Sequence, residues 1–190
     1  MSTQSPRRGT RVPDPDFVHP EVIAPETTSG RVARYTAAAL RLSLGWVFLW
    51  AFLDKAFGLG HETTHAQAWI HGGSPTKGFL AFAATGPFQS VYHHIAGQSW
   101  ADWLFMIGLL GIAVGLLAGI ALRLTAAAGA LLLVLMWSAV LPPANNLFMD
   151  DHLVYAMVLV LLAAVGAGHT LGLGKRWDAI GYVENHGWLR

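Results

Sequence analysis

The densest group of polar side chains in this sequence lies in a short segment between two apolar stretches. Amide, carboxylate and imidazole groups follow one another there, in Asn145, Asn146, Asp150, Asp151 and His152. The segment leads into an apolar stretch and therefore into a helix N-terminus, which has free backbone N–H donors. Histidine also titrates near neutral pH. The group predicts a site for an oxyanion or a polar head group, with helix capping and solvation as the alternative.

Beyond Arg34 at its start, the first apolar stretch contains three charged residues. Arg41 lies about two turns into this stretch. Two hypotheses explain it: its side chain snorkels to the lipid head groups, or it is a buried cation that holds a ligand carbonyl or a neighbouring helix. Asp54 and Lys55 follow thirteen and fourteen residues later, which is about 20 Å along a straight helix. They therefore cannot pair with Arg41 on that helix. A carboxylate at membrane depth usually has a partner or carries a proton, which makes Asp54 a candidate for proton transfer.

The segment 61–65, His-Glu-Thr-Thr-His, matches the zinc-protease pattern in which two histidines flank a glutamate. It lies in a short loop that is rich in histidine, so a chance match is the first reading, adventitious metal binding is the second, and no metal site is predicted. Cysteine is absent from the sequence, which excludes disulfide exchange, iron–sulfur ligation and thiolate zinc sites within this chain. Redox chemistry would need a bound cofactor or a partner protein.

Four apolar stretches must position these groups, and each is close to the about 17–25 residues that a helix needs to cross a bilayer. They cover residues 34–57, 103–122, 124–141 and 153–173. Ten of the twelve Lys and Arg residues lie before or early in the first stretch, between the second and third, or after the fourth. Because basic residues are retained in the cytoplasm, we expect both termini to be cytoplasmic and the loops 58–102 and 142–152 to face out.

Composition and length agree with a single membrane domain. Charged residues make up 12% of the chain, against about 25% in soluble domains. We expect an all-α, four-helix transmembrane bundle over 34–177, a disordered cytoplasmic tail over 1–33 and a cytoplasmic C-terminal tail over 178–190. The first outer loop should contain short amphipathic helices, because Ser74-Pro75 is a helix start. The net charge of +1 gives no reason to expect a nucleic-acid partner.

Small residues predict close packing of the second and third stretches. Gly111, Gly115 and Gly119 are spaced four apart on one helix face, and the third stretch begins with an alanine-rich segment. Such a stripe lets another backbone approach closely. The first reading is packing within the chain, and homodimerisation through the stripe is the alternative.

The order of these motifs is similar to that of a known family. The first stretch contains Leu40-Arg41-Leu42, then Gly45, then Asp54-Lys55, and the polar segment 145–152 leads to a glycine-rich end at 166–174. Over about residues 34–177 the chain resembles the DoxX/DoxD family, especially its actinobacterial branch. What the resemblance implies is a bacterial cytoplasmic-membrane redox protein. DoxD-type members form the large subunit of a thiosulfate:quinone oxidoreductase and work with a small second subunit.

The resemblance makes a quinone-linked oxidoreductase subunit the leading expectation, with electrons passing from a thiosulfate-like sulfur compound to quinone. No flavin is indicated. The candidates for proton transfer are Asp54, Asp151 and His152. The candidates for binding quinone or an oxyanion are Arg41, Lys55, Asn145, Asn146 and Asp150. The alternative is a non-enzymatic membrane scaffold that docks soluble redox proteins, and a small transporter or channel comes third.

Overall fold

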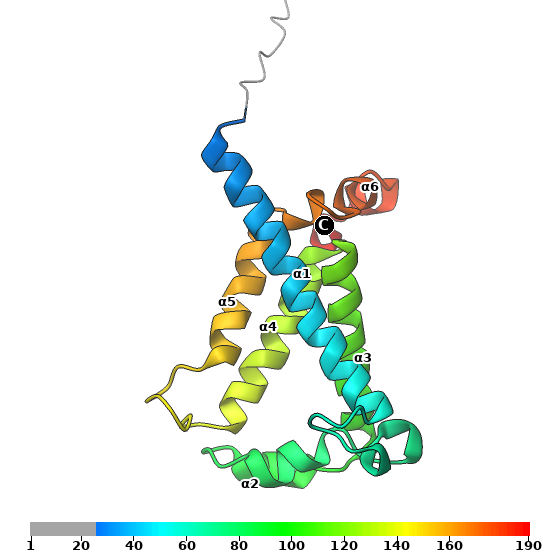
Figure 1. Cartoon of the computed structure of the whole chain (residues 1–190), viewed down its shortest axis with the longest axis vertical. Helices are drawn as coiled ribbons and strands as arrows, with labels where there is room; N and C mark the ends of the chain where they lie inside the picture. The colour runs from blue at the N-terminus through cyan, green and yellow to red at the C-terminus, as the bar shows by residue number, and fades with distance from the viewer. Residues whose placement is uncertain (1–25) are drawn as a thin grey trace, which may run out of the picture.

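The computed structural model describes residues 26–190, and every regular element in that part of the chain is a helix. Four of these helices form the bundle: α1 (Thr28–Phe57), α3 (Ser99–Ala118), α4 (Leu122–Ala139) and α5 (Asp151–Ala164) (Figure 1). The shorter segments are η1 (His65–Gln67), η2 (Trp69–His71), η3 (Phe79–Ala83), α2 (Gln89–Ile95), η4 (Ala167–His169), α6 (Gly174–Asp178), α7 (Gly181–Glu184) and η5 (Gly187–Leu189). The all-α prediction is confirmed. Residues 1–25 of the predicted disordered tail lie outside the described residues, and the prediction is wrong for 28–33, which form the first turns of α1.

Three helices, α1, α3 and α4, are long and apolar enough to cross a membrane, which suggests a multi-pass membrane protein. Helix α5 has 14 residues, or about 21 Å at 1.5 Å per residue. The predicted fourth stretch, 153–173, is therefore a continuous helix only as far as Ala164. Gly166 adopts a left-handed conformation (φ 62°) just after it, and this turns the chain out of the helical path.

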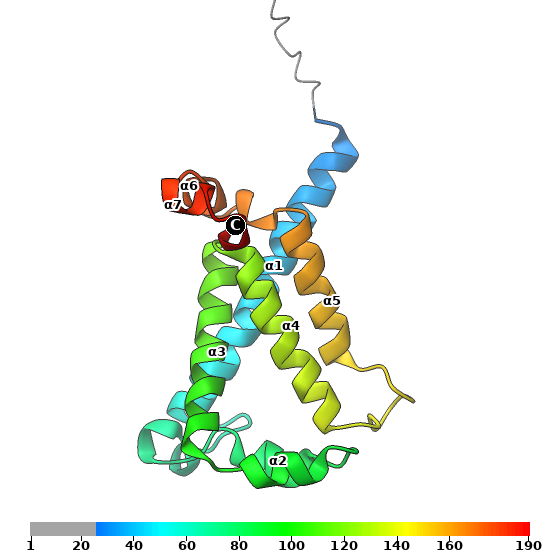
Figure 2. The ribbon, with the colours of Figure 1, turned by 180° about the vertical axis from the view of Figure 1, so that it is seen from behind.

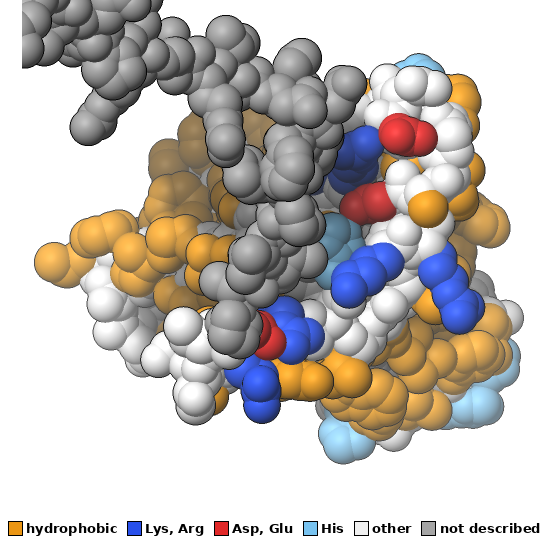
Figure 3. All heavy atoms as spheres, turned by 90° about the horizontal axis from the view of Figure 1, so that it is seen from above, with side chains coloured by type: hydrophobic (Ala, Val, Ile, Leu, Met, Phe, Trp, Pro, Cys, Tyr) orange, Lys and Arg blue, Asp and Glu red, His pale blue; other side chains and the backbone are white. Residues whose placement is uncertain are grey.

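The long helices pack as two pairs, α1 with α3 and α4 with α5. Figures 1 and 2 show that the pairs converge at the end where α6 and α7 lie and diverge at the other end, where α2 lies across the opening. We call these the basic end and the loop end. Lys and Arg side chains gather on the basic end (Figure 3).

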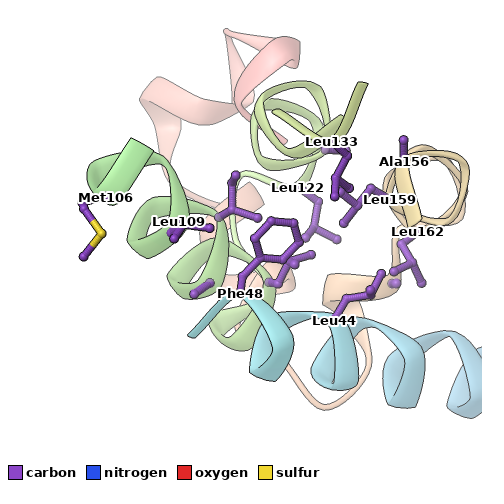
Figure 4. Close-up of a cluster of buried hydrophobic side chains, with 14 of the residues drawn as sticks. Leu44, Phe48, Met106, Leu109, Leu122, Leu133, Ala156, Leu159 and Leu162 are labelled. Atoms are coloured by element: carbon purple, nitrogen blue, oxygen red, sulfur yellow. The ribbon is translucent and has the colours of Figure 1, made fainter. Parts of the chain in front are cut away.

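Apolar side chains from all four long helices meet between the pairs. Figure 4 shows the centre of this cluster, which includes Leu44, Phe48, Leu109, Leu133 and Leu159. Many large apolar residues point outward instead, and Leu131 on α4 has 61% of its surface exposed. Such a surface is stable in lipid, where van der Waals packing rather than water exclusion holds helices together.

The predicted contact between the small faces of α3 and α4 forms over part of their length. A Cβ atom on Gly115 would overlap the side chain of Thr125 on α4, so the two backbones are close there. Nothing lies within 4 Å of the Cβ position of Gly111, one turn closer to the loop end. A Cβ atom on Gly129 of α4 would overlap Leu159 of α5 and would lie 3.5 Å from Ile112 of α3. Helices α3 and α4 therefore stay in contact from Gly115 to Ile112, while the face of α3 that carries Gly111 meets no neighbour.

Candidate functional site

Arg41 is fully buried near the basic end and donates to backbone carbonyl groups. Its Nη1 donates to the carbonyl oxygens of Leu116 and Leu117 (3.1 Å for the latter), and its Nη2 donates to those of Thr170 (3.3 Å) and Leu171 (2.8 Å). The first two carbonyls belong to the last turn of α3, where no intrahelical donor reaches them. Arg41 thus joins α1, the end of α3 and the segment after α5.

Glycine residues surround the Arg41 guanidinium and enclose it. A Cβ atom on Gly119 would lie 3.0 Å from Arg41 Nη1, and one on Gly172 would lie 3.1 Å from Nη2. A Cβ atom on Gly168 would overlap the carbonyl oxygen of Gly119. These contacts explain the glycine-rich sequence at 166–174. Of the two readings of Arg41, they favour a cation that holds neighbouring segments together.

Asp54 is buried at the end of α1 and accepts hydrogen bonds from three consecutive backbone N–H groups. The donors are His61 (3.3 Å), Glu62 (3.1 Å) and Thr63 (2.9 Å). Lys55 Nζ lies 3.3 Å from the carboxylate of Glu62. A carboxylate at membrane depth was expected to have a partner. The partner of Asp54 is the backbone of the loop that follows α1.

The His-Glu-Thr-Thr-His segment is not a helix in its first four residues. His61 packs edge-on against Trp50, with ring centroids 5.1 Å apart, and His65 packs against His71 at 4.3 Å. The two histidines of the pattern therefore do not share a helix face. The zinc-protease pattern requires that face, so the structure removes the basis of that reading.

The carboxylates before α5 cap this helix and hold His152. Asp150 Oδ1 accepts from the backbone N–H of Leu153 (3.2 Å), and its Oδ2 lies 2.7 Å from Nδ1 of His152. Asp151 Oδ1 lies 3.5 Å from the same nitrogen. One ligand atom from each of the three side chains falls within 4.8 Å of the others. The hydrogen bonds account for this spacing, and the cap is the expected role of an N-cap aspartate.

Asn145 is exposed, while Asn146 stabilises its own loop. The side-chain oxygen of Asn146 accepts from the backbone N–H groups of Phe148 (3.3 Å) and Met149 (3.4 Å). Helix α1 ends on one side of the loop end and α5 begins on the other side (Figure 1). The structure thus brings together Asp150, Asp151 and His152, pairs Asp54 with its own loop, and leaves Arg41 at the opposite end.

A cavity of about 1150 Å³ lies at the loop end, between α3, α4 and residues 62–95. This exceeds the about 300–1,000 Å³ of most small-molecule pockets. Its polar lining comes mainly from the end of α1 and the segment that follows it, in Lys55, Glu62, Gln67, His71 and Lys77. Its apolar lining includes Phe82, Val91, Leu104, Phe105, Leu132, Leu135 and Met136. Of the predicted site residues, Lys55 lines this cavity.

Two side chains that the sequence analysis missed fasten residues 62–95 to the bundle. The buried Asp102 accepts from Ser74 Oγ (2.8 Å) and from the backbone N–H (3.0 Å) and Oγ1 (2.7 Å) of Thr76. Tyr92 on α2 donates to the carbonyl oxygen of Leu135 on α4 (3.1 Å). Asp102 could have been recognised from the sequence, because it is a carboxylate in the first turn of an apolar helix.

Comparison of the chain with protein-family models, curated proteins and solved structures finds no match. The resemblance to the DoxX/DoxD family therefore stays a prediction, and the geometry of the cavity carries the functional argument.

Proposed function

We propose that this chain is a multi-pass membrane protein that binds an isoprenoid quinone in the cavity at the loop end, as the membrane subunit of a quinone-linked oxidoreductase. The observation that carries the proposal is the cavity itself. Its long apolar wall suits a ring and a prenyl tail. Lys55, Gln67 and His71 supply hydrogen-bond donors for the ring oxygens.

The chemistry at this site is the reduction of quinone to quinol, which takes up two electrons and two protons. The chain has no cysteine, so we assign electron delivery to a partner redox subunit that oxidises a reduced sulfur compound of the thiosulfate class. The exposed Glu62 beside Lys55 offers a route for protons from water. The partner and the sulfur compound rest on the family resemblance alone.

We further propose four membrane crossings in a bacterial cytoplasmic membrane, with both termini cytoplasmic. The basic end then faces the cytoplasm, as retention of basic residues favours. Helix α5 is shorter than the about 30 Å hydrocarbon core. We assign the rest of the crossing to the segment after it, which contains η4 and whose carbonyl groups at Thr170 and Leu171 are satisfied by Arg41.

Cysteine labelling tests the orientation. The native sequence has no cysteine, so a single cysteine at the exposed Ser90 should react with an impermeant maleimide in whole cells. A cysteine at the exposed Ala179, on the basic end, should react only after the cells are lysed. The opposite pattern would overturn the orientation.

Mass spectrometry of lipids extracted from gently purified protein tests the quinone. We expect quinone with the wild type and with Leu131→Trp, whose side chain faces away from the cavity on α4. Leu132→Trp places its ring in the cavity and should abolish the retention of quinone. Wild-type protein that carries no quinone but copurifies with a soluble redox protein would overturn the proposal in favour of the scaffold alternative.

A further inference from the structure

The apolar part of the cavity continues into an open seam between α3 and α4. The two helices touch at Gly115 and Thr125 and again at Ile112 and Gly129, and nothing lies within 4 Å of a Cβ atom built on Gly111 or Gly108. Both glycines follow the cavity-lining Leu104 at helical spacing, so they lie on the same face of α3. Figure 2 shows α3 and α4 diverging towards α2.

The side chains along this seam are those of a lipid-facing surface. Leu104 on α3 and Leu135 on α4 both line the cavity, yet they are 67% and 46% exposed. Together with the empty space beside Gly108 and Gly111, this exposure fits an opening on the α3–α4 side of the cavity. Because α3 and α4 are both helices of membrane-spanning length and composition, this opening is flanked by apolar helix surface that lipid would cover.

The other side of the cavity has a polar part, and residues 62–95, which we call the covering segment, are held to the bundle by hydrogen bonds. Glu62, at the polar part of the lining, has a side chain that is 84% exposed. The covering segment is held to α3 through Asp102 and to α4 through Tyr92, and the backbone N–H of Thr85 donates to the carbonyl oxygen of Ala139 (3.0 Å). These hydrogen bonds hold the segment over the cavity, so moving it aside to admit a long apolar molecule would break them.

We infer that the seam between α3 and α4 is a lateral portal, through which a long-chain amphiphile enters from the bilayer and its tail remains in contact with lipid. The polar head then lies towards Lys55 and the tail passes Leu104 and Gly111. This inference rests on the proposed quinone site and adds the route of entry and the class of ligand. The ligand is one whose tail is longer than the cavity.

Filling the seam without disturbing the cavity tests the portal. Gly111→Leu adds a side chain where the structure has open space, so it should fold, and Gly108→Leu repeats the test one turn further along. The control is Ala127→Leu, which adds the same bulk on an exposed face of α4. Binding is measured in nanodiscs with two probes that share one quinone ring, one with a single isoprene unit and one with a long polyisoprene tail.

We expect both glycine variants to bind the long-tailed probe about tenfold to hundredfold more weakly, as overpacking costs of about 1–3 kcal/mol imply. The short-tailed probe and the control should bind as in the wild type. Equal loss of both probes, or no loss of either, would overturn the portal while the quinone site stands. Failure of the wild type to bind either probe would overturn the quinone site itself.

If the variants do not fold, photolabelling of the wild-type protein tests the portal instead. A quinone with a photoreactive group at the end of its tail should label peptides that contain Gly108 and Leu135, or the surrounding lipid. Labelling confined to residues 62–95 would place the tail under the covering segment and overturn the portal.

Discussion

Replacing Arg41 with leucine should destabilise the protein more than any other single loss of charge near the basic end. The guanidinium donates to four backbone carbonyls, at Leu116, Leu117, Thr170 and Leu171. A buried carbonyl that loses its donor costs about 1–3 kcal/mol. Removing the cation also removes its own desolvation cost, so the four losses do not add in full. Breaking one side of a buried charged network costs about 3–5 kcal/mol in total.

The expected change is large enough to see in a thermal melt of the detergent-solubilised protein. For chains of this size about 1 kcal/mol shifts the melting temperature by roughly 2–4 °C. Arg41→Leu should therefore melt about 6–20 °C below the wild type. Arg41→Lys should fall between the two, because one ammonium group has three donors and cannot serve four carbonyls in a fixed plane.

Arg34→Leu is the matched control. Arg34 lies two turns earlier on α1 and pairs with Glu26 through two hydrogen bonds of 2.9 Å, but both side chains are exposed. Exposed pairs contribute about 0–1 kcal/mol, so this variant should melt within a few degrees of the wild type. If Arg41→Leu melted as Arg34→Leu does, the carbonyls would have other donors and the structural role of Arg41 would be refuted.

Three further predictions concern the loop end and the start of α1. Asp54→Ala leaves the three backbone N–H groups of residues 61–63 without their acceptor, so limited proteolysis should cut there faster, and unchanged cleavage would contradict the anchoring role. Asp102→Ala should speed hydrogen exchange in residues 74–80 while leaving α5 unchanged, since Asp102 holds Ser74 and Thr76. The hydrogen bond from Arg34 holds the pKa of Glu26 below its usual range, so the pair should persist as pH falls through the ordinary glutamate value of about 4.3 and break only at lower pH. NMR titration of Glu26 should show this, and Arg34→Gln should restore the ordinary pKa.

The sequence by itself determined the helical class and most helix limits. Long apolar runs are local signals, and both ends of α3 and α4 and the last residue of α1 agree with the predicted stretches to within four residues, whereas α1 begins at Thr28 rather than at residue 34. The cap at Asp150 follows from local chemistry too, because an aspartate before an apolar run satisfies the first free N–H groups of the helix. Helix α5 was predicted too long, because apolar residues continue past Gly166 while the backbone leaves the helix there.

Only the tertiary structure decided what the polar residues contact. Arg41 binds carbonyls that lie 75 to 130 positions away in the chain, and no spacing rule reaches that far. The cavity depends on how α3 and α4 separate beyond their contacts at Gly115 and Ile112, and on the segment that covers the opening. Sequence patterns report which face of a helix is small or apolar. They do not report which neighbour that face meets, because this depends on how all the helices pack at once.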